Sequence, residues 1–283
     1  MLIPLATSLV PKTASDPYTL ACIRSWRLSG CAPLSFHSES ELAELGARGT
    51  DPGIALVEAP TDTTDLYAKP LVALEDIFGY FDRQGRGFTL TNADILFARN
   101  FSAPAMADLR PDGPSDAGVL VVSRRKNFTR SLDEVTVYEH GFDLFHLSRR
   151  LPDAIPRRFC LGVPWWDYLV PVAGLLRGFT LVQFRDPPIY HRDDAPVAWS
   201  MDSWMRAGVD CAAFLVGILD TLPPLPAEDA AFADALRRVH GAEAAGVAQD
   251  LLVHWLHGLS TECRALIDRR SHWIEATVPW LHP

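Results

Sequence analysis

Residues 2–10 read LIPLATSLV, a short apolar run that ends at Pro11. A run of this length, closed by a proline, predicts a buried strand rather than a helix. Apolar residues then recur every three or four positions across residues 20–26, which predicts a helix that stops at Gly30. Residues 32–36 predict a second strand. The chain therefore opens as strand, helix, strand.

The same alternation continues along the chain. Ser38 and Glu41 form a capping-box signature, which predicts the start of a second helix. Further on, the pattern predicts a third strand, an amphipathic helix and a fourth strand at residues 54–57, 71–81 and 88–97. Alternating strands and helices indicate a parallel or mixed sheet with helices on both faces, where ligands bind at the carboxyl ends of strands.

The last part of the chain has a different pattern. Three more stretches look extended, at residues 117–123, 135–147 and 179–184. From Met201 onward apolar residues recur at helical spacing without a strand signal, and no helix crosses the proline-rich break at residues 223–226. We therefore predict an α/β domain over residues 1–200 and a helical subdomain over residues 201–283.

Composition excludes several classes of function. The formal net charge of −9 argues against binding to nucleic acid or anionic lipid, and the short basic run at residues 124–126 is interpreted first as a solvated face and second as an anionic-substrate patch. Five cysteines without C-x-x-C spacing predict neither a zinc site nor a disulfide framework. No apolar run reaches the ~20 residues of a membrane helix, and the N-terminus lacks a signal-peptide pattern, so a cytoplasmic location is expected.

Three common nucleotide-binding and hydrolase motifs are missing from the sequence. It contains no Walker A element, no G-x-G-x-x-G and no G-x-S-x-G. Readings as a P-loop NTPase, a dinucleotide-binding enzyme or an α/β-hydrolase therefore lack support.

Residues 88–97, FTLTNADILF, place the carboxylate of Asp94 in an otherwise apolar run. Burying an ionised carboxylate is costly unless it is paired or bound to a metal. A divalent cation that bridges a nucleoside diphosphate is one candidate partner, because hard cations take carboxylate and phosphate oxygens together. The alternative is an aspartate that caps a turn or pairs with an arginine.

Four segments together resemble a group of bacterial GT-A-fold glycosyltransferases. They are NADI at residues 92–95, GFDLF at 141–145, LGVPWWDY at 161–168 and YH at 190–191, and their order and approximate separations agree with that group. The resemblance spans roughly residues 2–195. It implies a GT-A-like, Rossmann-like mixed sheet flanked by helices, and transfer of a sugar from a nucleoside diphosphate sugar to an acceptor hydroxyl.

The resemblance also implies roles for particular residues. In GT-A enzymes an Asp-x-Asp element helps to bind metal and sugar nucleotide, a later acidic residue often serves as acceptor base in inverting members, and a late histidine often completes the metal shell. These would be Asn92 with Asp94, then Asp167, then His191, with Mn²⁺ or Mg²⁺ as the metal. Asn92 replaces the first aspartate and removes one negative charge, although its carbonyl can still ligate the metal or bond to the donor.

Two tryptophans stand beside the proposed base. The flat faces of Trp165 and Trp166 suit the apolar face of a sugar ring, and Asp167 beside them could accept a hydroxyl proton. The alternative is that both rings anchor a loop onto the core while Asp167 caps the next helix. Asp143, which follows a Gly-Phe turn, is interpreted equally as a ligand contact and as a turn cap.

The remaining candidates are single residues after predicted strands or near a helix start. Thr7 and Ser8 follow the first strand, where this fold would receive the nucleoside, and His37 ends the second strand, where similar sequences often have Asn. Lys69 could neutralise a phosphate. The corresponding alternatives are turn formation for Thr7 and Ser8, a surface lysine for Lys69 and, for His191, a solvated loop histidine.

These observations predict a metal-assisted glycosyltransferase. The main rival, motivated by Asn92, is a non-catalytic sugar- or nucleotide-binding module. A nucleotidyltransferase ranks last, because residues 5–12 lack the glycine-rich, basic loop expected of one. The helical tail could bind the acceptor, form a dimer or dock a partner enzyme.

Overall fold

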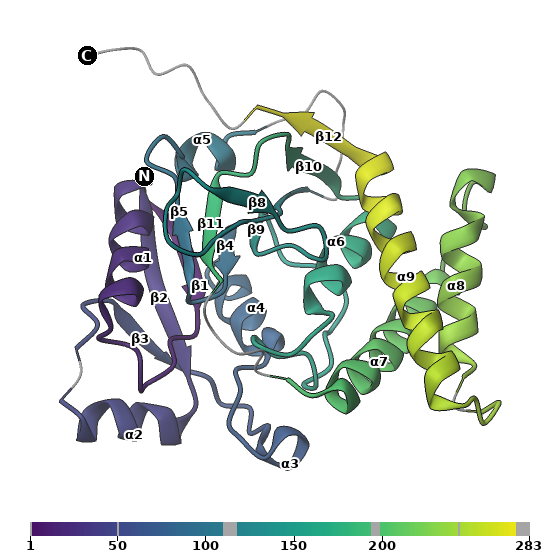
Figure 1. Cartoon of the computed structure of the whole chain (residues 1–283), viewed down its shortest axis with the longest axis horizontal. Coiled ribbons are helices and arrows are strands. Elements are labelled where there is room, and N and C mark those ends of the chain that lie inside the picture. The colour runs from purple at the N-terminus through teal and green to yellow at the C-terminus, as the bar shows by residue number, and fades with distance from the viewer. Residues whose placement is uncertain (1, 50, 110–117, 194–198, 243, 276–283) are drawn as a thin grey trace.

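The structure of the protein is a computed structural model that describes residues 2–49, 51–109, 118–193, 199–242 and 244–275. Within these residues, eight strands form one mixed sheet (Figure 1). From edge to edge they are β12 (Ser271–Ile274), β10 (Thr180–Phe184), β6 (Val119–Ser123), β9 (Leu144–Leu147), β4 (Phe88–Thr91), β1 (Ile3–Thr7), β2 (Cys31–His37) and β3 (Ala55–Glu58). Only β9 is antiparallel to its neighbours in this part of the chain. The carboxyl ends of β1, β4 and β6 therefore meet at one edge of the sheet.

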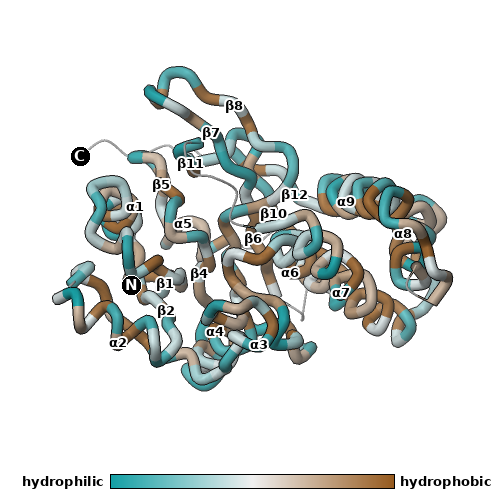
Figure 2. The backbone as a smooth tube through the Cα atoms, turned by 60° about the horizontal axis from the view of Figure 1, so that its bottom comes forward, coloured by the Kyte–Doolittle hydropathy of each residue, from teal (hydrophilic) through white to brown (hydrophobic). Residues whose placement is uncertain are grey.

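A second, smaller sheet projects from the first. It contains β5 (Ile95–Phe97), β11 (Ile189–Arg192), β7 (Lys126–Phe128) and β8 (Val135–Val137), in that order. Figure 2 shows this sheet beside α1 (Pro17–Leu28), on the side of the molecule away from α8 (Ala230–His240).

Helices cover both faces of the main sheet. The remaining helices are α2 (Glu39–Ala47), α3 (Thr64–Tyr67), α4 (Leu74–Asp82), α5 (Ala103–Ala107), α6 (Trp166–Leu176), α7 (Met201–Leu219) and α9 (Gln249–Arg270), with a 3-10 turn at Ala227–Asp229. The predicted capping box is present at α2, where the Glu41 N–H donates to Ser38 Oγ at 3.2 Å and the Ser38 N–H donates to Glu41 Oε2 at 3.3 Å. The predicted α/β, Rossmann-like architecture is confirmed.

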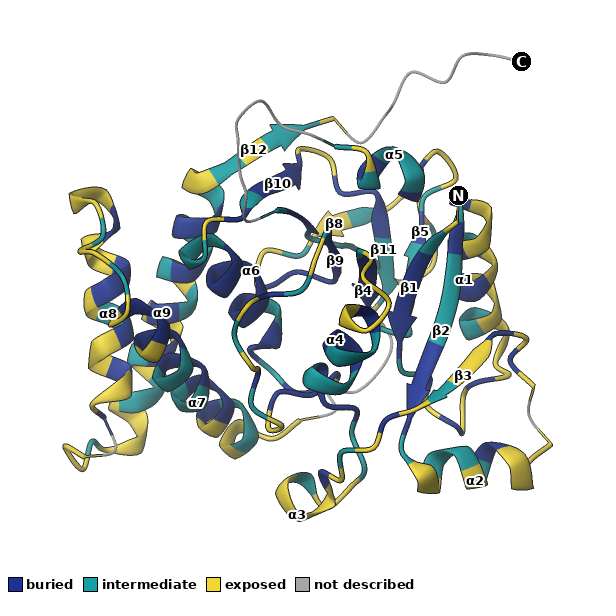
Figure 3. Ribbon diagram, turned by 180° about the vertical axis from the view of Figure 1, so that it is seen from behind, coloured by how far each residue is buried: buried dark blue, intermediate teal, exposed yellow. Residues whose placement is uncertain are grey.

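Alternate residues of the central strands point into two different hydrophobic cores. Leu5 and Val121 belong to the core shared with α1, α2 and α5, while Ala6 and Leu120 belong to the core shared with α4 and α6. This is the two-residue period expected of a sheet that is buried on both faces. Figure 3 shows the central strands mostly buried between these layers.

The C-terminal helices join the second of these cores. Cys211 of α7, Phe232 of α8 and Leu266 of α9 lie in the same hydrophobic cluster as residues of α4 and α6. All five cysteines are free and buried. In the part of the chain that is described, no helix is long and apolar enough to cross a membrane.

Two expectations about strands are wrong. Residues 88–97 do not form one strand, because the chain turns at Asn92–Ala93–Asp94 and its two halves enter different sheets as β4 and β5. Residues 201–283 are not helical throughout, because β12 follows α9 and pairs in parallel with β10 at the edge of the main sheet. The division of the chain at residue 200 stays a prediction.

Candidate functional site

The two predicted metal ligands lie together. Asp94 occupies the turn between β4 and β5, and His191 lies on β11, where it pairs with Ile95. Their side chains, 97 residues apart in sequence, meet with His191 Nε2 and Asp94 Oδ2 at 3.1 Å. Asp94 is not in a buried strand as expected, because its side chain is 50% exposed at the turn.

The pairing affects the ionisation of Asp94. The surrounding protein opposes the charged form, but the hydrogen bond and the charge of His191 outweigh this effect and hold the pKa of Asp94 below its ordinary value. Asp94 is therefore a carboxylate at neutral pH, as a metal ligand must be.

This pair has a geometry that suits a hard divalent cation. Two adjacent ligands of an octahedral ion with bonds of about 2.1 Å lie about 3 Å apart, close to the observed separation of Asp94 Oδ2 and His191 Nε2. The other ring nitrogen, His191 Nδ1, is buried without a hydrogen-bond partner among the described residues. Those residues hold no cluster of three or more His, Cys, Asp or Glu side chains placed to bind a metal. The protein would thus supply only part of a coordination shell.

Asn92 and Asp143 are joined in a partly buried network. Asn92 Nδ2 donates to Asp143 Oδ1 at 2.6 Å, and Arg125 forms an ion pair with Asp143 Oδ2 at 2.9 Å. The Thr91 hydroxyl donates to the Asp143 carbonyl at 2.7 Å. Both predicted contact residues therefore lie at the same sheet edge, with Asp143 held by neighbours rather than capping a turn.

Arg125 is a site residue that the sequence analysis did not single out. It donates to Asn127 at 2.9 Å, and its guanidinium lies 4.2 Å from the centre of the Tyr138 ring. The interpretation of residues 124–126 as a solvated face is wrong, because each of the three forms an ion pair and each is mostly buried. The run of three basic residues was the sequence signal that could have pointed to Arg125. Three cations that become mostly buried need carboxylates nearby.

Asp167 lies in the first turn of α6, beside this network. Burial and the negative charge of Asp143 raise its pKa, backbone N–H groups and the charge of Arg125 lower it, and the result is about 7. Gly141 makes room for the carboxylate, because a Cβ at Gly141 would stand 2.1 Å from Asp167 Oδ2. The carboxyl group of Asp167, with its pKa of about 7, thus packs against Gly141.

The two tryptophans do not offer stacking surfaces. Trp165 is 2% exposed and Trp166 is 3% exposed, and both belong to the hydrophobic core. Trp165 Nε1 donates to the Trp204 carbonyl at 3.0 Å, and the Trp166 ring packs on Phe145. The alternative, in which the rings anchor the loop onto the core, describes the structure. Trp165 also adopts a left-handed backbone conformation (φ 76°), which is uncommon for a residue with a side chain.

The loop after β1 is supported from inside the protein. His37 is fully buried and its Nε2 lies 2.7 Å from Ser35 Oγ, which in turn accepts from the Leu9 N–H at 2.9 Å. The His37 side chain is therefore held inside the protein beside Ser35, and its role in a nucleotide site stays a prediction. Thr7 is buried with its hydroxyl unpaired among the described residues, and Ser8 is partly exposed.

Tyr18 ties the site to α1. Its hydroxyl donates to the Asp94 carbonyl at 2.9 Å and accepts from the Arg192 N–H at 3.0 Å. The Tyr18 ring also lies under the Arg192 guanidinium, 4.3 Å away. Tyr18 thus bridges the residues that carry the Asp94–His191 pair, and no local sequence pattern indicates this.

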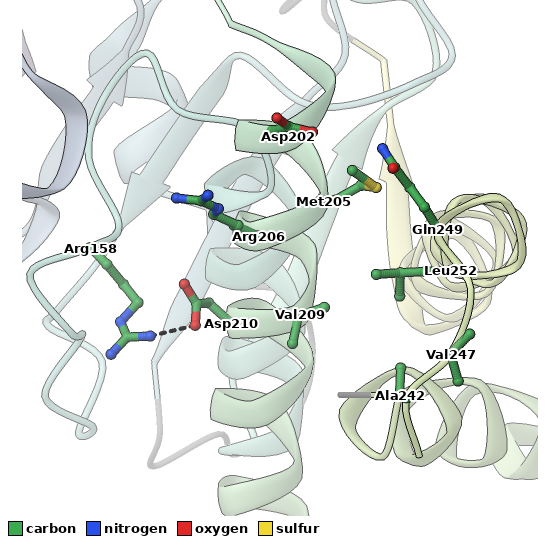
Figure 4. A pocket seen from close by; sticks show the side chains of 11 residues that line it. Arg158, Asp202, Met205, Arg206, Val209, Asp210, Ala242, Val247, Gln249 and Leu252 are labelled. Atoms are coloured by element: carbon green, nitrogen blue, oxygen red, sulfur yellow. Dashed lines mark hydrogen bonds and ion pairs between the residues drawn. The ribbon is translucent and has the colours of Figure 1, made fainter. Parts of the chain in front are cut away.

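Two cavities lie elsewhere. The larger, about 780 Å³, lies over α7 and the connection between α8 and α9 (Figure 4). Arg158 and Asp210 form an ion pair on one side of α7, and Met205 and Val209 point to the other side (Figure 4). Lys69 is exposed and lines the second cavity, apart from the residues described above.

Comparisons with known proteins leave the function open. Neither a protein-family model nor a curated protein matches this chain. The solved structure of the inositol-1-phosphate CTP transferase from T. maritima aligns with a TM-score of 0.37 and 12% identity, over 79% of this chain and 98% of that chain.

Proposed function

We propose that the protein is a glycosyltransferase that moves a sugar from a nucleoside diphosphate sugar to an acceptor hydroxyl. The observation that carries this proposal is the meeting of Asp94 and His191 at 3.1 Å, next to the network of Asn92, Asp143 and Arg125. These groups gather at the edge where parallel strands end, which is where α/β folds bind ligands. At the coarser level, the same arrangement supports a nucleotide-dependent transferase.

Asp94 and His191 would hold Mn²⁺ or Mg²⁺, which when bound neutralises the charge of the departing diphosphate. Diphosphate oxygens and water would complete the coordination shell, since the described residues supply two ligands. The Asn92 carbonyl and the unpaired Thr7 hydroxyl would contact the donor.

Asp167 would act as the base that accepts the proton of the acceptor hydroxyl. General-base catalysis is most effective when the pKa of the base lies near the working pH, and that of Asp167 is about 7. Above this pH the carboxylate is available to take a proton.

A second candidate is a binding module without catalysis. Asn92 and Asp143 bond to each other, and Asp143 also pairs with Arg125, so part of their bonding capacity is used inside the protein. In this second candidate the site would bind a nucleotide sugar and would not catalyse its transfer.

Two measurements separate these functions. The first is a thermal-shift panel of UDP-, GDP-, CMP- and dTDP-sugars with and without Mn²⁺, since a ligand of the folded state raises the melting temperature. The second is turnover of the selected donor by the wild type and by Asp167→Asn. Loss of a general base costs about 100- to 10,000-fold in rate, while donor affinity should persist. A variant with wild-type turnover contradicts the base, and a wild type that binds donor but transfers it to nothing, including water, indicates the binding module.

A further inference from the structure

The second cavity opens beside the segment that leads to Asp167. Its volume is about 340 Å³. Its lining comes from α3, the loop before α6 and the start of α7. Figures 1 and 3 show α3 near the start of α7, at the end of the molecule where the arrowheads of β1 and β2 point. This volume is at the small end of the ~300–1,000 Å³ range of ligand pockets, which suits a single sugar ring better than a long glycan.

One wall of the cavity offers an aromatic face. Trp199 lines the cavity and is 41% exposed. This contrasts with Trp165 and Trp166, whose rings are buried. An open indole face is a surface on which the apolar side of a sugar ring can stack.

Another wall carries an unpaired positive charge. Lys69 is exposed, and within the described residues no ion pair or hydrogen bond engages its ammonium group. The carboxylate that shares this cavity, Asp65, is paired with Arg157 at 2.6 Å. Lys69 is thus left as an uncompensated cation, and an ammonium group binds a single anionic group as a point charge.

Hydroxyl groups complete the lining. Thr64, Ser200 and Ser203 all contribute to the cavity. Hydroxyls both donate and accept, so they can match the hydroxyl groups of a sugar.

We propose that this cavity binds a monosaccharide that carries one anionic group, a phosphate or a carboxylate, with the ring against Trp199 and the anion at Lys69. We assign this sugar as the acceptor of the transferred sugar, an assignment that rests on the proposed function. Pro164 lines the cavity and lies three residues before Asp167, so their Cα atoms are at most about 11 Å apart. The loop that leads into α6, where the proposed base lies, therefore forms part of the cavity wall.

The test is calorimetric titration of the full chain, without donor, with glucose 6-phosphate, glucuronate, glucose and inorganic phosphate. We expect at least one of the two anionic sugars to bind, and glucose and phosphate to bind at least about tenfold more weakly than it does, because each lacks one of the two recognised features. Whichever of the two anionic sugars binds more tightly shows whether the anionic group of the ligand is a phosphate or a carboxylate.

Variants assign the binding to this cavity. Lys69→Gln should weaken the anionic sugar about tenfold and leave glucose unchanged, whereas Trp199→Ala should weaken every sugar. Lys12→Gln is the matched control, since Lys12 is also exposed but lies outside the cavity. The proposal is overturned if the wild type binds neither anionic sugar, if glucose or phosphate alone binds as tightly, or if Lys69→Gln binds like the wild type. Because donor is absent, these outcomes are independent of whether the donor panel succeeds.

Discussion

Asp167 and Gly141 show how a single residue sets the chemistry of another. The carboxylate of Asp167 occupies the place where any side chain at position 141 would begin. Burial and the negative charge of Asp143 raise the pKa of Asp167 to about 7. The proposed base therefore requires a glycine at position 141.

We predict that Gly141→Ala displaces the Asp167 carboxylate. The added methyl group would stand 2.1 Å from Asp167 Oδ2, so the variant should lose about 1–3 kcal/mol in unfolding free energy. Urea denaturation measures the change. Gly258→Ala is the control, because no atom lies within 4 Å of the new methyl group and alanine favours the helix. Equal stability of the wild type and Gly141→Ala would contradict the packing described.

The raised pKa of Asp167 predicts a dependence of stability on pH. Between about pH 4 and pH 7 the folded protein keeps a proton that the unfolded chain releases, so this group makes the fold less stable as pH rises through that window. Asp167→Asn cannot titrate. Its unfolding free energy relative to the wild type should therefore increase by roughly 2–3 kcal/mol from pH 5 to pH 8. A difference that stays constant between the two pH values would refute the raised pKa.

At the scale of elements, α1 fixes the geometry of the Asp94–His191 pair. Trp26 Nε1 donates to the Ile95 carbonyl at 2.7 Å, the Phe97 N–H donates to Ser25 Oγ at 3.0 Å, and Tyr18 bridges the chain at Asp94 and Arg192. Side chains of α1 thus hold β5 directly and β11 through Tyr18.

We predict that Tyr18→Phe weakens this attachment. The variant keeps the ring but loses two hydrogen bonds, which should lower the unfolding free energy by about 1–2 kcal/mol and weaken metal-dependent nucleotide binding. Tyr80→Phe is the control, because the described residues provide no hydrogen bond to the Tyr80 hydroxyl. Tyr80→Phe should change neither the unfolding free energy nor the nucleotide affinity in this way. Identical nucleotide affinity in Tyr18→Phe and the wild type would remove Tyr18 from the support of the site.

Apart from the one-turn helix α3, the elements up to residue 82 could be predicted because each has a local cause. The apolar period, the capping box at Ser38 and the glycine stop at Gly30 all act within a few residues. The turn at Asn92–Ala93–Asp94 was missed because apolar residues flank it on both sides, as they would flank the middle of a strand. The strand β12 was missed because its partner, β10, lies about 90 residues earlier in the chain.

At the scale of the whole molecule, the site forms where three distant parts of the chain converge. The first strands of the chain, the small sheet and the start of α6 each contribute a polar side chain to one edge. The sequence order of Asp94, Asp167 and His191 supported their selection, but their partners Arg125 and Tyr18 depend on the order of strands in the sheets, which no local pattern contains. The burial of Trp165 likewise depends on α7, because Gly208 of α7 lies against its ring, while Trp166 packs on Phe145 of β9.

A double-mutant cycle on Asp94 and His191 tests the proposed metal site most directly. Affinity for the nucleoside diphosphate that the donor panel selects is measured by calorimetry with Mn²⁺ and with EDTA, for the wild type, Asp94→Ala, His191→Ala and the double variant. If both residues hold one ion, each single change should cost at least about tenfold with Mn²⁺, the double variant should bind little more weakly than either, and EDTA should remove the differences. Single variants that bind nucleotide and Mn²⁺ as tightly as the wild type would contradict the proposed metal site.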